Sequence, residues 1–296
     1  MNSLELQFSG AADQAACQLC LGKRLALLAE RGSQRLLRCF ECGGIFVSPQ
    51  PDPIAIAVHF QEPELDEEAL QRRFEQNREN VLAKVASYVA RRRTGGRIVD
   101  VGCATGLFLR RFFRREEWES WGIDLNLAEV RCAQKNGVRT YHGTLREACF
   151  DDSFFDVVTV LDAFYYFPHP EEELSEVRRS LKPDGLLVIE LPLATSRIWG
   201  ASTALGRLLK GRRKSLLDTS DHLYYFTPQS ISRLLQRCGF RVDSIFRLPG
   251  NRQETLRRRM VFGAYYFISA FLERVSGGAI FLGPRFFVVA SKDRPR

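Results

Sequence analysis

Apolar runs alternate with segments of helical spacing over residues 97–191, and this alternation determines the predicted fold. The apolar runs predict a strand that begins at Arg97 and further strands at residues 121–124, 138–143, 155–162 and 186–191. The run at 155–162 is mostly apolar, as expected for a strand that is buried on both faces. Strands that alternate with helices form a parallel sheet with right-handed crossovers. Ligands of such sheets bind at the carboxyl ends of the strands.

Helical spacing also marks residues 63–93, which precede this region. The apolar positions at this spacing are Leu70, Phe74, Val81, Leu82, Val85, Tyr88 and Val89. We expect this helix to pack against the sheet and to stop at the glycines of residues 94–96. Three prolines in residues 48–53 predict an extended linker before it. Residues 171–181 predict a second helix, and residues 182–185 predict a turn.

The first 50 residues contain two cysteine pairs with CxxC spacing. The pairs are Cys17 with Cys20, and Cys39 with Cys42. Two such pairs at this separation predict a zinc site, because zinc takes four tetrahedral ligands and each tight turn supplies two thiolates. A short segment builds little core, so a metal would stabilise it. The alternative is a pair of disulfides, which a chain without a secretory signal disfavours. Four thiolates fill the zinc shell, so the predicted role is structural.

A glycine turn follows the strand that begins at Arg97. Gly102 and Gly106 lie in this turn, where glycine lets the backbone approach a ligand closely. Asp124 ends the next strand about 20 residues later, where nucleotide-binding α/β folds place the carboxylate that accepts hydrogen bonds from a ribose. The two features together predict a nucleotide-type cofactor at this edge.

Charge divides the chain into two unequal parts. The formal net charge is +8, but residues 197–296 carry 19 Lys and Arg against 6 Asp and Glu. Within that part, residues 197–214 and 252–282 mix cations with large apolar side chains, as interfacial segments on anionic membranes do. The alternative is an ordinary substrate lid with an apolar inner face. Residues 260–272 are too short to span a bilayer, and the N-terminus lacks a secretory signal. We therefore expect a cytoplasmic protein with a peripheral contact at the inner membrane face.

The order of these motifs resembles the class I S-adenosylmethionine-dependent methyltransferases, in the branch that has an N-terminal CxxC…CxxC zinc ribbon. The resemblance runs over residues 17–292. It rests on the cysteine pairs, on Val99-Asp-Val-Gly-Cys-Ala-Thr-Gly106, Gly122-Ile-Asp124, Phe155-Asp-Val-Val-Thr-Val-Leu-Asp162, Leu181-Lys-Pro-Asp-Gly185, and on His222-Leu-Tyr-Tyr-Phe-Thr-Pro228 with Leu234-Leu-Gln-Arg-Cys-Gly-Phe240. It implies an α/β, Rossmann-like sheet of seven mostly parallel strands with helices on both faces, preceded by a small zinc ribbon. The last two strands, at 240–248 and 285–292, would form an antiparallel hairpin.

The resemblance also implies a domain organisation. Residues 1–53 would form the zinc-ribbon-like segment, and residues 54–94 a linker and helix. Residues 95–296 would form the methyltransferase domain, with basic and apolar lid insertions at about 193–221 and 250–284.

Cofactor contacts follow from the resemblance position by position. The loop around the methionine end of S-adenosylmethionine is implied to contain Asp100, Gly102, Cys103, Ala104 and Gly106. The ribose and adenine contacts are implied to be Asp124, Leu125, Asn126, Thr144 and Leu145. Leu161 and Asp162 would lie beneath the sulfonium. The middle glycine of the family's loop is Ala104 here, and we expect its methyl group to be tolerated.

The acceptor side departs from related sequences, which often have Glu-His after the fourth strand. This chain has Tyr165 and Tyr166 there, which indicates a different substrate pocket. His222, with a usual pKa near 6.5, is the first candidate for a general base, followed by the two tyrosines. The alternative for His222 is a structural role in the lid.

Three functions remain open from the sequence. The first is a methyltransferase for a small-molecule, lipid-linked or sugar-linked acceptor, with O- or N-methylation expected. The second is an RNA methyltransferase that uses the ribbon and the basic C-terminal third to bind nucleic acid. The third is a non-catalytic protein that binds S-adenosylmethionine or serves as a scaffold.

Overall fold

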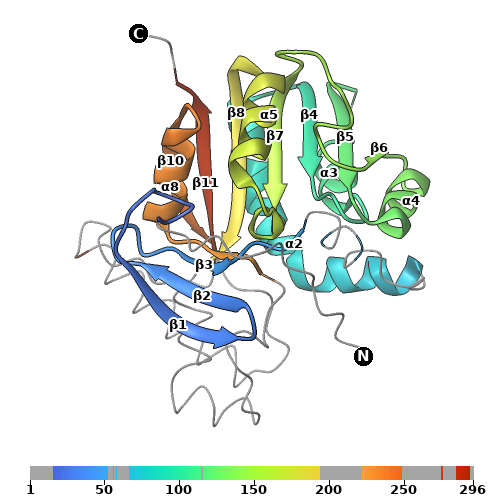
Figure 1. Ribbon diagram of the computed structural model, residues 1–296. Helices are drawn as coiled ribbons and strands as arrows, with labels where there is room; N and C mark the ends of the chain where they lie inside the picture. The colour runs from blue at the N-terminus through green and yellow to red at the C-terminus, as the bar shows by residue number, and fades with distance from the viewer. Residues whose placement is uncertain are drawn as a thin grey trace.

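The protein consists of a large sheet with helices on both faces and a small sheet beside it (Figure 1). The structure is a computed structural model, and it describes residues 16–52, 67–114, 116–193, 222–248 and 285–293, together with residues 56, 58 and 275. The predicted lid insertions at 193–221 and 250–284 lie outside the described residues, except for residues 193 and 275.

The large sheet has seven strands in the order β10-β11-β8-β7-β4-β5-β6. Its strands are β4 (Gly96–Val101), β5 (Trp118–Asp124), β6 (Arg139–His142), β7 (Phe155–Leu161), β8 (Leu181–Pro192), β10 (Phe240–Leu248) and β11 (Arg285–Lys292). Strands β4 to β8 pair in parallel, and β11 pairs antiparallel with both β8 and β10. The predicted seven-stranded fold with a C-terminal antiparallel hairpin is confirmed.

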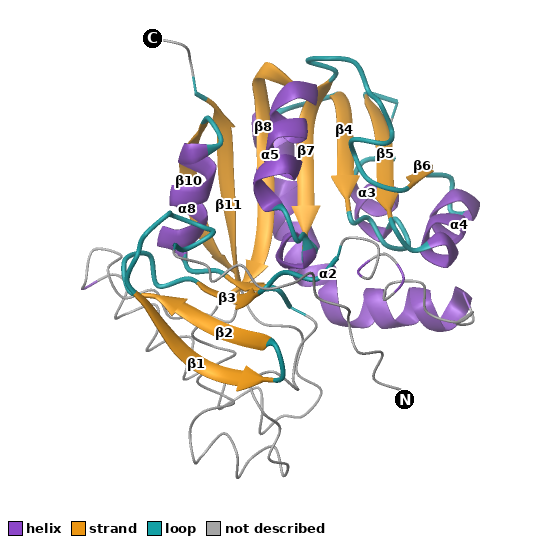
Figure 2. Cartoon of the chain, in the orientation of Figure 1, coloured by secondary structure: helices purple, strands orange, loops and turns teal. Residues whose placement is uncertain are grey.

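Helices cover both faces of the large sheet (Figure 2). They are α2 (Glu67–Arg92), α3 (Leu107–Phe112), α4 (Leu127–Lys135), the 3-10 helix η1 (Phe164–Tyr166), α5 (Pro170–Ser180) and α8 (Pro228–Arg237). One apolar core contains buried side chains of α5 and α8, and a second contains those of α2 and α3. In α2 the predicted apolar positions Val81, Leu82, Val85 and Val89 are buried in the second core.

Residues 182–185 differ from the predicted turn, because they lie inside β8. Leu181 is paired with Phe155, and the next pairing joins Leu186 to Val157. The four intervening residues therefore form an irregularity within the strand. The ammonium of Lys182, in this segment, lies 2.8 Å from the Asp156 carboxylate of β7, which ties the irregularity to the neighbouring strand.

The small sheet contains the N-terminal strands β1 (Leu25–Arg31), β2 (Gln34–Cys39) and β3 (Ile45–Ser48) and the distant strand β9 (Tyr224–Tyr225). Ile45 is paired with Tyr225, and Phe46 with Tyr224, in antiparallel register. The predicted boundary at residue 53 stays a prediction, but the sheet of the N-terminal segment includes a strand from the C-terminal part. Among the described residues, no helix is long and apolar enough to cross a membrane.

Candidate functional site

The turn between β4 and α3 has the backbone conformation of a ligand-binding loop. Gly102, Ala104 and Gly106 have φ values of 77°, 48° and 71°. A Cβ atom on Gly102 would lie 2.4 Å from the Cβ of Ala163, so a side chain does not fit there. Ala104 adopts a left-handed conformation that an alanine rarely takes, and an Asp124 carboxylate oxygen accepts a hydrogen bond from its N–H at 2.8 Å. The left-handed backbone and the hydrogen bond to Asp124 therefore fix the conformation of this turn.

Asp124 lies at the end of β5 beside this turn. Its second carboxylate oxygen accepts a hydrogen bond from the Asn126 N–H at 2.9 Å. The side chain of Asn126 caps α4 by accepting hydrogen bonds from two backbone N–H groups. Burial raises the pKa of Asp124, although the N–H groups of Asn126, Ala104 and Leu125 act in the opposite direction. The Leu125 carbonyl lies 2.9 Å from the His142 ring nitrogen.

The remaining predicted cofactor residues surround the same edge of the sheet. Asp100 is buried and accepts a hydrogen bond from the Thr159 hydroxyl at 2.6 Å, and burial raises its pKa to about 8. Cys103 is buried, and its N–H donates to the Ile123 carbonyl at 3.0 Å. Thr144 begins the turn after β6, where its N–H donates to the Glu147 carboxylate at 2.7 Å. The next residue, Leu145, is buried in the core.

These residues fit S-adenosylmethionine. The left-handed turn leaves its backbone free of side chains at Gly102 and Gly106, and Asp124 holds a carboxylate at the end of the adjacent strand. This is the carboxyl edge of the parallel strands, where such sheets bind nucleotides. A surface hollow lined by Arg92, Pro183 and Asp184 lies at the start of β8, the opposite end of the strands, and does not coincide with this site.

Four charged side chains meet at the end of β7. Arg78 of α2 lies 2.5 Å from both the Asp162 and the Glu190 carboxylates. Arg285 of β11 also donates to both carboxylates. Each guanidinium therefore bridges the same two acids, and we call these four residues the charge ring. Burial alone would raise the pKa of Asp162, but the charges of Arg285 and Arg78 lower it.

The charge ring was only partly visible in the sequence. Asp162 was predicted as a cofactor residue, and it has a left-handed φ of 65° directly after the buried Leu161. Arg78, Glu190 and Arg285 were missed. A signal existed for Glu190, because it is an acid inside an otherwise apolar run, and the structure buries it completely. Such a buried acid needs a cationic partner.

The three predicted acceptor-side residues lie together beside the charge ring. The rings of Tyr165 and His222 are stacked, with centroids 3.8 Å apart and planes inclined by 23°. Tyr166 meets the His222 ring edge-on at 5.3 Å. The Tyr165 hydroxyl donates to Asp162 at 2.8 Å, and burial beside this acid raises the Tyr165 pKa well above its usual value. These surroundings favour the protonated form of Tyr165.

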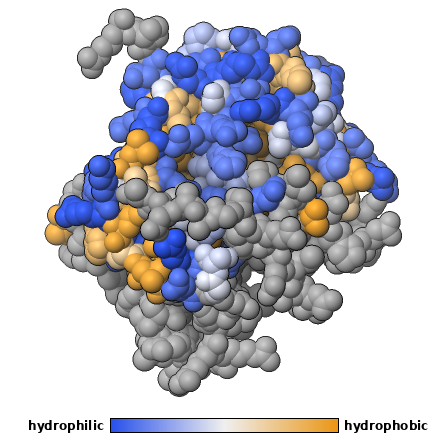
Figure 3. All heavy atoms as spheres, viewed as in Figure 1, coloured by the Kyte–Doolittle hydropathy of each residue, from blue (hydrophilic) through white to orange (hydrophobic). Residues whose placement is uncertain are grey.

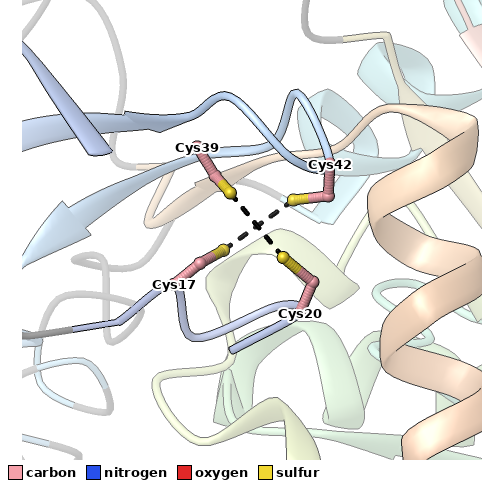
Figure 4. A group of neighbouring side chains, drawn as sticks. All are labelled: Cys17, Cys20, Cys39 and Cys42. Carbon is pink, nitrogen blue, oxygen red and sulfur yellow. Dashed lines mark hydrogen bonds between the residues drawn. The ribbon is translucent and has the colours of Figure 1, made fainter. Parts of the chain in front are cut away.

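The four N-terminal cysteines converge on one point (Figure 4). Their sulfur atoms all lie within 4.8 Å of one another. The Sγ atoms of Cys17 and Cys42 are 3.8 Å apart, and those of Cys20 and Cys39 are 3.6 Å apart. A tetrahedral zinc with Zn–S bonds of about 2.3 Å requires S···S separations of about 3.8 Å. A disulfide requires about 2.05 Å. The cluster therefore fits a structural zinc, and all four cysteines are free of disulfide bonds in this structure.

Backbone N–H groups support the same conclusion. Those of Leu19, Gly22 and Glu41 point at cysteine sulfurs from 3.4, 3.4 and 3.3 Å. Hydrogen bonds of this kind stabilise thiolates, the form that binds a metal. The hydrogen bond from Cys42 and the backbone N–H groups of Leu19 and Cys20 lower the pKa of Cys17 to about 6. Burial raises the pKa of Cys39, and the contact with Cys17 raises that of Cys42, so one thiolate is favoured in the metal-free cluster. Four thiolates would fill the coordination shell of a bound zinc, so the cysteines would hold a structural metal without a place for a substrate.

Curated proteins are similar to part of this chain. A ubiquinone/menaquinone biosynthesis C-methyltransferase UbiE of Paraburkholderia phymatum is 31% identical over 115 residues, which are 36% of this chain and 46% of that protein. A phthiotriol/phenolphthiotriol dimycocerosates methyltransferase of Mycobacterium leprae is 34% identical over 101 residues, 32% of this chain and 37% of that protein. The chain thus spans less than half of the length of these curated relatives.

Solved structures show the same fold. A SAM-dependent methyltransferase from Archaeoglobus fulgidus superposes with a TM-score of 0.51 at 20% identity, over 76% of this chain and 99% of that one. The model of the methyltransferase domain family matches residues 70–245, more than half of the chain. This protein therefore belongs to the methyltransferase domain family.

Proposed function

We propose that the protein methylates a hydroxyl or amine group of a small-molecule, lipid-linked or sugar-linked acceptor. The observation that carries this proposal is the stack of His222 on Tyr165, beside Asp162 at the carboxyl end of β7. An imidazole at this edge is suited to receive the proton that an acceptor oxygen or nitrogen loses. The names of two relatives, a ubiquinone/menaquinone biosynthesis C-methyltransferase and a phthiotriol/phenolphthiotriol dimycocerosates methyltransferase, support a small-molecule or lipid acceptor but not the choice of oxygen or nitrogen.

The chain's own residues would mainly position the reactants. When bound, S-adenosylmethionine supplies a methyl group that is already activated on a sulfonium, so orientation and exclusion of water provide most of the rate enhancement. The turn at Gly102 and the carboxylate of Asp124 would hold the cofactor. The aromatic rings of Tyr165 and Tyr166 would exclude water on the acceptor side, and His222 would hold the acceptor's proton.

The acceptor class is tested by methyl transfer from labelled S-adenosylmethionine into fractionated cell extracts. We expect label in the lipid or small-molecule fraction. Label confined to RNA would replace this proposal with the RNA methyltransferase alternative, and label in no fraction would contradict it. The labelled product identifies the acceptor atom. An ether or ester shows that it is oxygen, an amine shows that it is nitrogen, and a new carbon–carbon bond shows that it is neither.

The role of His222 is tested by His222→Gln, which keeps a polar side chain of similar length but removes the titrating group. We expect kcat to fall by about 10²-fold or more, the usual contribution of a general base, while the cofactor dissociation constant stays within about twofold. His142→Gln is the matched control, because His142 contacts the Leu125 carbonyl on the cofactor side. Unchanged kcat in His222→Gln would assign His222 a structural role.

A peripheral membrane contact forms the second part of the proposal. The supporting observation is the sequence of residues 197–214 and 252–282, in which cations flank large apolar residues. We expect the protein to pellet with vesicles of anionic phospholipid at low salt and to stay in the supernatant with neutral vesicles. Absence from both pellets would contradict the contact without affecting the methyltransferase activity.

A further inference from the structure

Leu223 forms main-chain hydrogen bonds with both the cysteine-rich segment, residues 17–48, and the acceptor side. Its N–H donates a hydrogen bond to the Tyr165 carbonyl at 3.0 Å, and its carbonyl accepts one from the Val47 N–H at 2.9 Å. Tyr165 belongs to η1, and Val47 belongs to β3 of the small sheet. Leu223 is itself buried. The main chain directly after His222 is therefore held from both sides, by the acceptor side and by the cysteine-rich segment.

The next residue, Tyr224, adds a side-chain connection between the same two regions. Its hydroxyl lies 2.7 Å from the Gln18 side-chain oxygen and 3.1 Å from the Pro168 carbonyl. Gln18 lies within the first cysteine pair, between Cys17 and Cys20. Pro168 follows η1 in the chain. The fully buried Tyr224 thus joins one cysteine turn to the loop behind the acceptor-side tyrosines.

Thr227 connects the other cysteine turn to the same segment. Its hydroxyl donates to the Cys42 carbonyl at 2.8 Å and accepts a hydrogen bond from the Ser230 N–H at 3.0 Å. The first contact reaches a predicted zinc ligand, and the second caps α8. Both ends of residues 222–227 are therefore anchored, with His222 at one end and Thr227 at the other.

The cofactor turn is anchored differently, within the large sheet. The Gly102 N–H donates to the Ile123 carbonyl of β5 at 2.8 Å, and Asp124 of the same strand accepts from Ala104. These contacts connect β4 to β5, on the far side of β7 from the antiparallel hairpin. The hydrogen bonds that fix the cofactor turn therefore lie within the large sheet, whereas those that fix residues 223–227 reach the cysteine-rich segment, although both regions share one apolar core.

We propose that the cysteine-rich segment, with zinc bound, positions the acceptor-side residues His222 and Tyr165. Zinc bound by the four cysteines fixes the two cysteine turns, these turns hold residues 223–227, and this segment holds His222 against Tyr165. The cofactor turn remains assembled without the metal. This inference rests on the proposed function, in which His222 and Tyr165 face the acceptor.

The first test measures the stack directly and needs no acceptor. The full-length protein is labelled with ¹³C-histidine, and the ring signal of His222 is identified among four histidines by its loss in His222→Gln. In the zinc-loaded protein, the ring current of Tyr165 shifts the ring signal of His222, because the two rings are stacked. After zinc removal with a chelator, confirmed by metal analysis, we expect the signal to move toward the value of an exposed histidine. Cofactor affinity, measured by calorimetry, should stay within about twofold.

Two results would overturn the proposal. One is an unchanged His222 signal in protein shown to be free of zinc. The other is a parallel loss of cofactor binding and of the circular dichroism of the folded state, which would make the metal a support of the whole domain. Because neither readout depends on turnover, a failure of the proposed acceptor class is distinguishable from a failure of the positioning role.

The second test keeps the metal in place. Tyr224→Phe combined with Thr227→Val removes both side-chain links but leaves all four cysteines intact. We expect bound zinc and cofactor affinity to be unchanged, the His222 signal to shift, and kcat to fall by about tenfold. Thr227→Ser is the matched control, since its hydroxyl can still reach Cys42 and cap α8. Unchanged His222 signal and kcat in the double variant would contradict the proposal.

Discussion

The Tyr165 hydroxyl donates a hydrogen bond to Asp162 at 2.8 Å, and both residues lie directly after β7 at the carboxyl edge of the sheet. Asp162 stays ionised because Arg285 and Arg78 lower its pKa against the effect of burial. Burial and the charge of Asp162 together raise the Tyr165 pKa well above 10. The pair therefore combines an ionised acceptor with a protonated donor, and this hydrogen bond holds the Tyr165 ring on which His222 is stacked.

Tyr165→Phe tests this relationship. The phenyl ring keeps the stacking surface but loses the hydrogen bond to a charged group, which contributes about 1.5–3 kcal/mol. We expect lower stability and reduced kcat, with the pH profile of kcat retained because Tyr165 does not titrate in the working range. Denaturant unfolding and a pH–rate series provide the two measurements. Loss of the profile's basic limb in the variant would instead make Tyr165 the titrating group.

Arg285→Met tests the charge ring. The side chain of Arg285 is 8% exposed, and that of its partner Glu190 is 0% exposed. Removing one partner of a buried ion pair costs about 3–5 kcal/mol, because it leaves a carboxylate without sufficient compensation. The measurement is the free energy of unfolding in urea. The matched control is Arg241→Met, because the Arg241 side chain is 59% exposed in its pair with Asp243, and a pair with such an exposed partner contributes about 0–1 kcal/mol. An equal loss of unfolding free energy in the two variants would show that the charge ring contributes no more to stability than the control pair does.

Gly102→Ala tests the cofactor turn. The new methyl group meets Ala163 at 2.4 Å, in a left-handed conformation that alanine disfavours. We expect cofactor affinity to fall by more than about tenfold, which corresponds to about 1.4 kcal/mol. Gly32→Ala is the control for backbone strain alone, because Gly32 has a φ of 57° and no atom within 4 Å of an added Cβ. Unchanged affinity in Gly102→Ala would exclude this turn from the cofactor site.

The pKa of Asp100 predicts how stability changes with pH in the cofactor-free protein. Burial raises this pKa to about 8, whereas an unfolded aspartate titrates near 3.9. Between these values the folded state binds one more proton than the unfolded state, so this contribution to stability falls as pH rises from about 4 to about 8. Asp100→Asn should remove this part of the slope in thermal unfolding measured across that range. An identical slope in the variant would show that Asp100 is already ionised.

Local patterns in the sequence were sufficient to predict the strand ends and the glycine turn that carry the proposed cofactor contacts. Gly102, Gly106 and Asp124 each lie at the end of a strand or in the turn that follows it, and parallel strands bring their carboxyl ends to one edge. The four cysteines were predicted by their spacing alone, since each pair forms a tight turn with two thiolates. These features depend on residues that are close in sequence or on the period of the strands.

Pairings across long stretches of sequence were decided by the tertiary structure. Arg78, Glu190 and Arg285 have no common motif, and they meet because α2, β8 and β11 converge beside β7. Strand β9 joins β3 across about 180 residues, which no local pattern records. A single buried acid or a two-residue strand does not indicate its partner in the sequence. The partners of both are selected in the assembled fold, by the free energy of pairing buried charges and backbone groups.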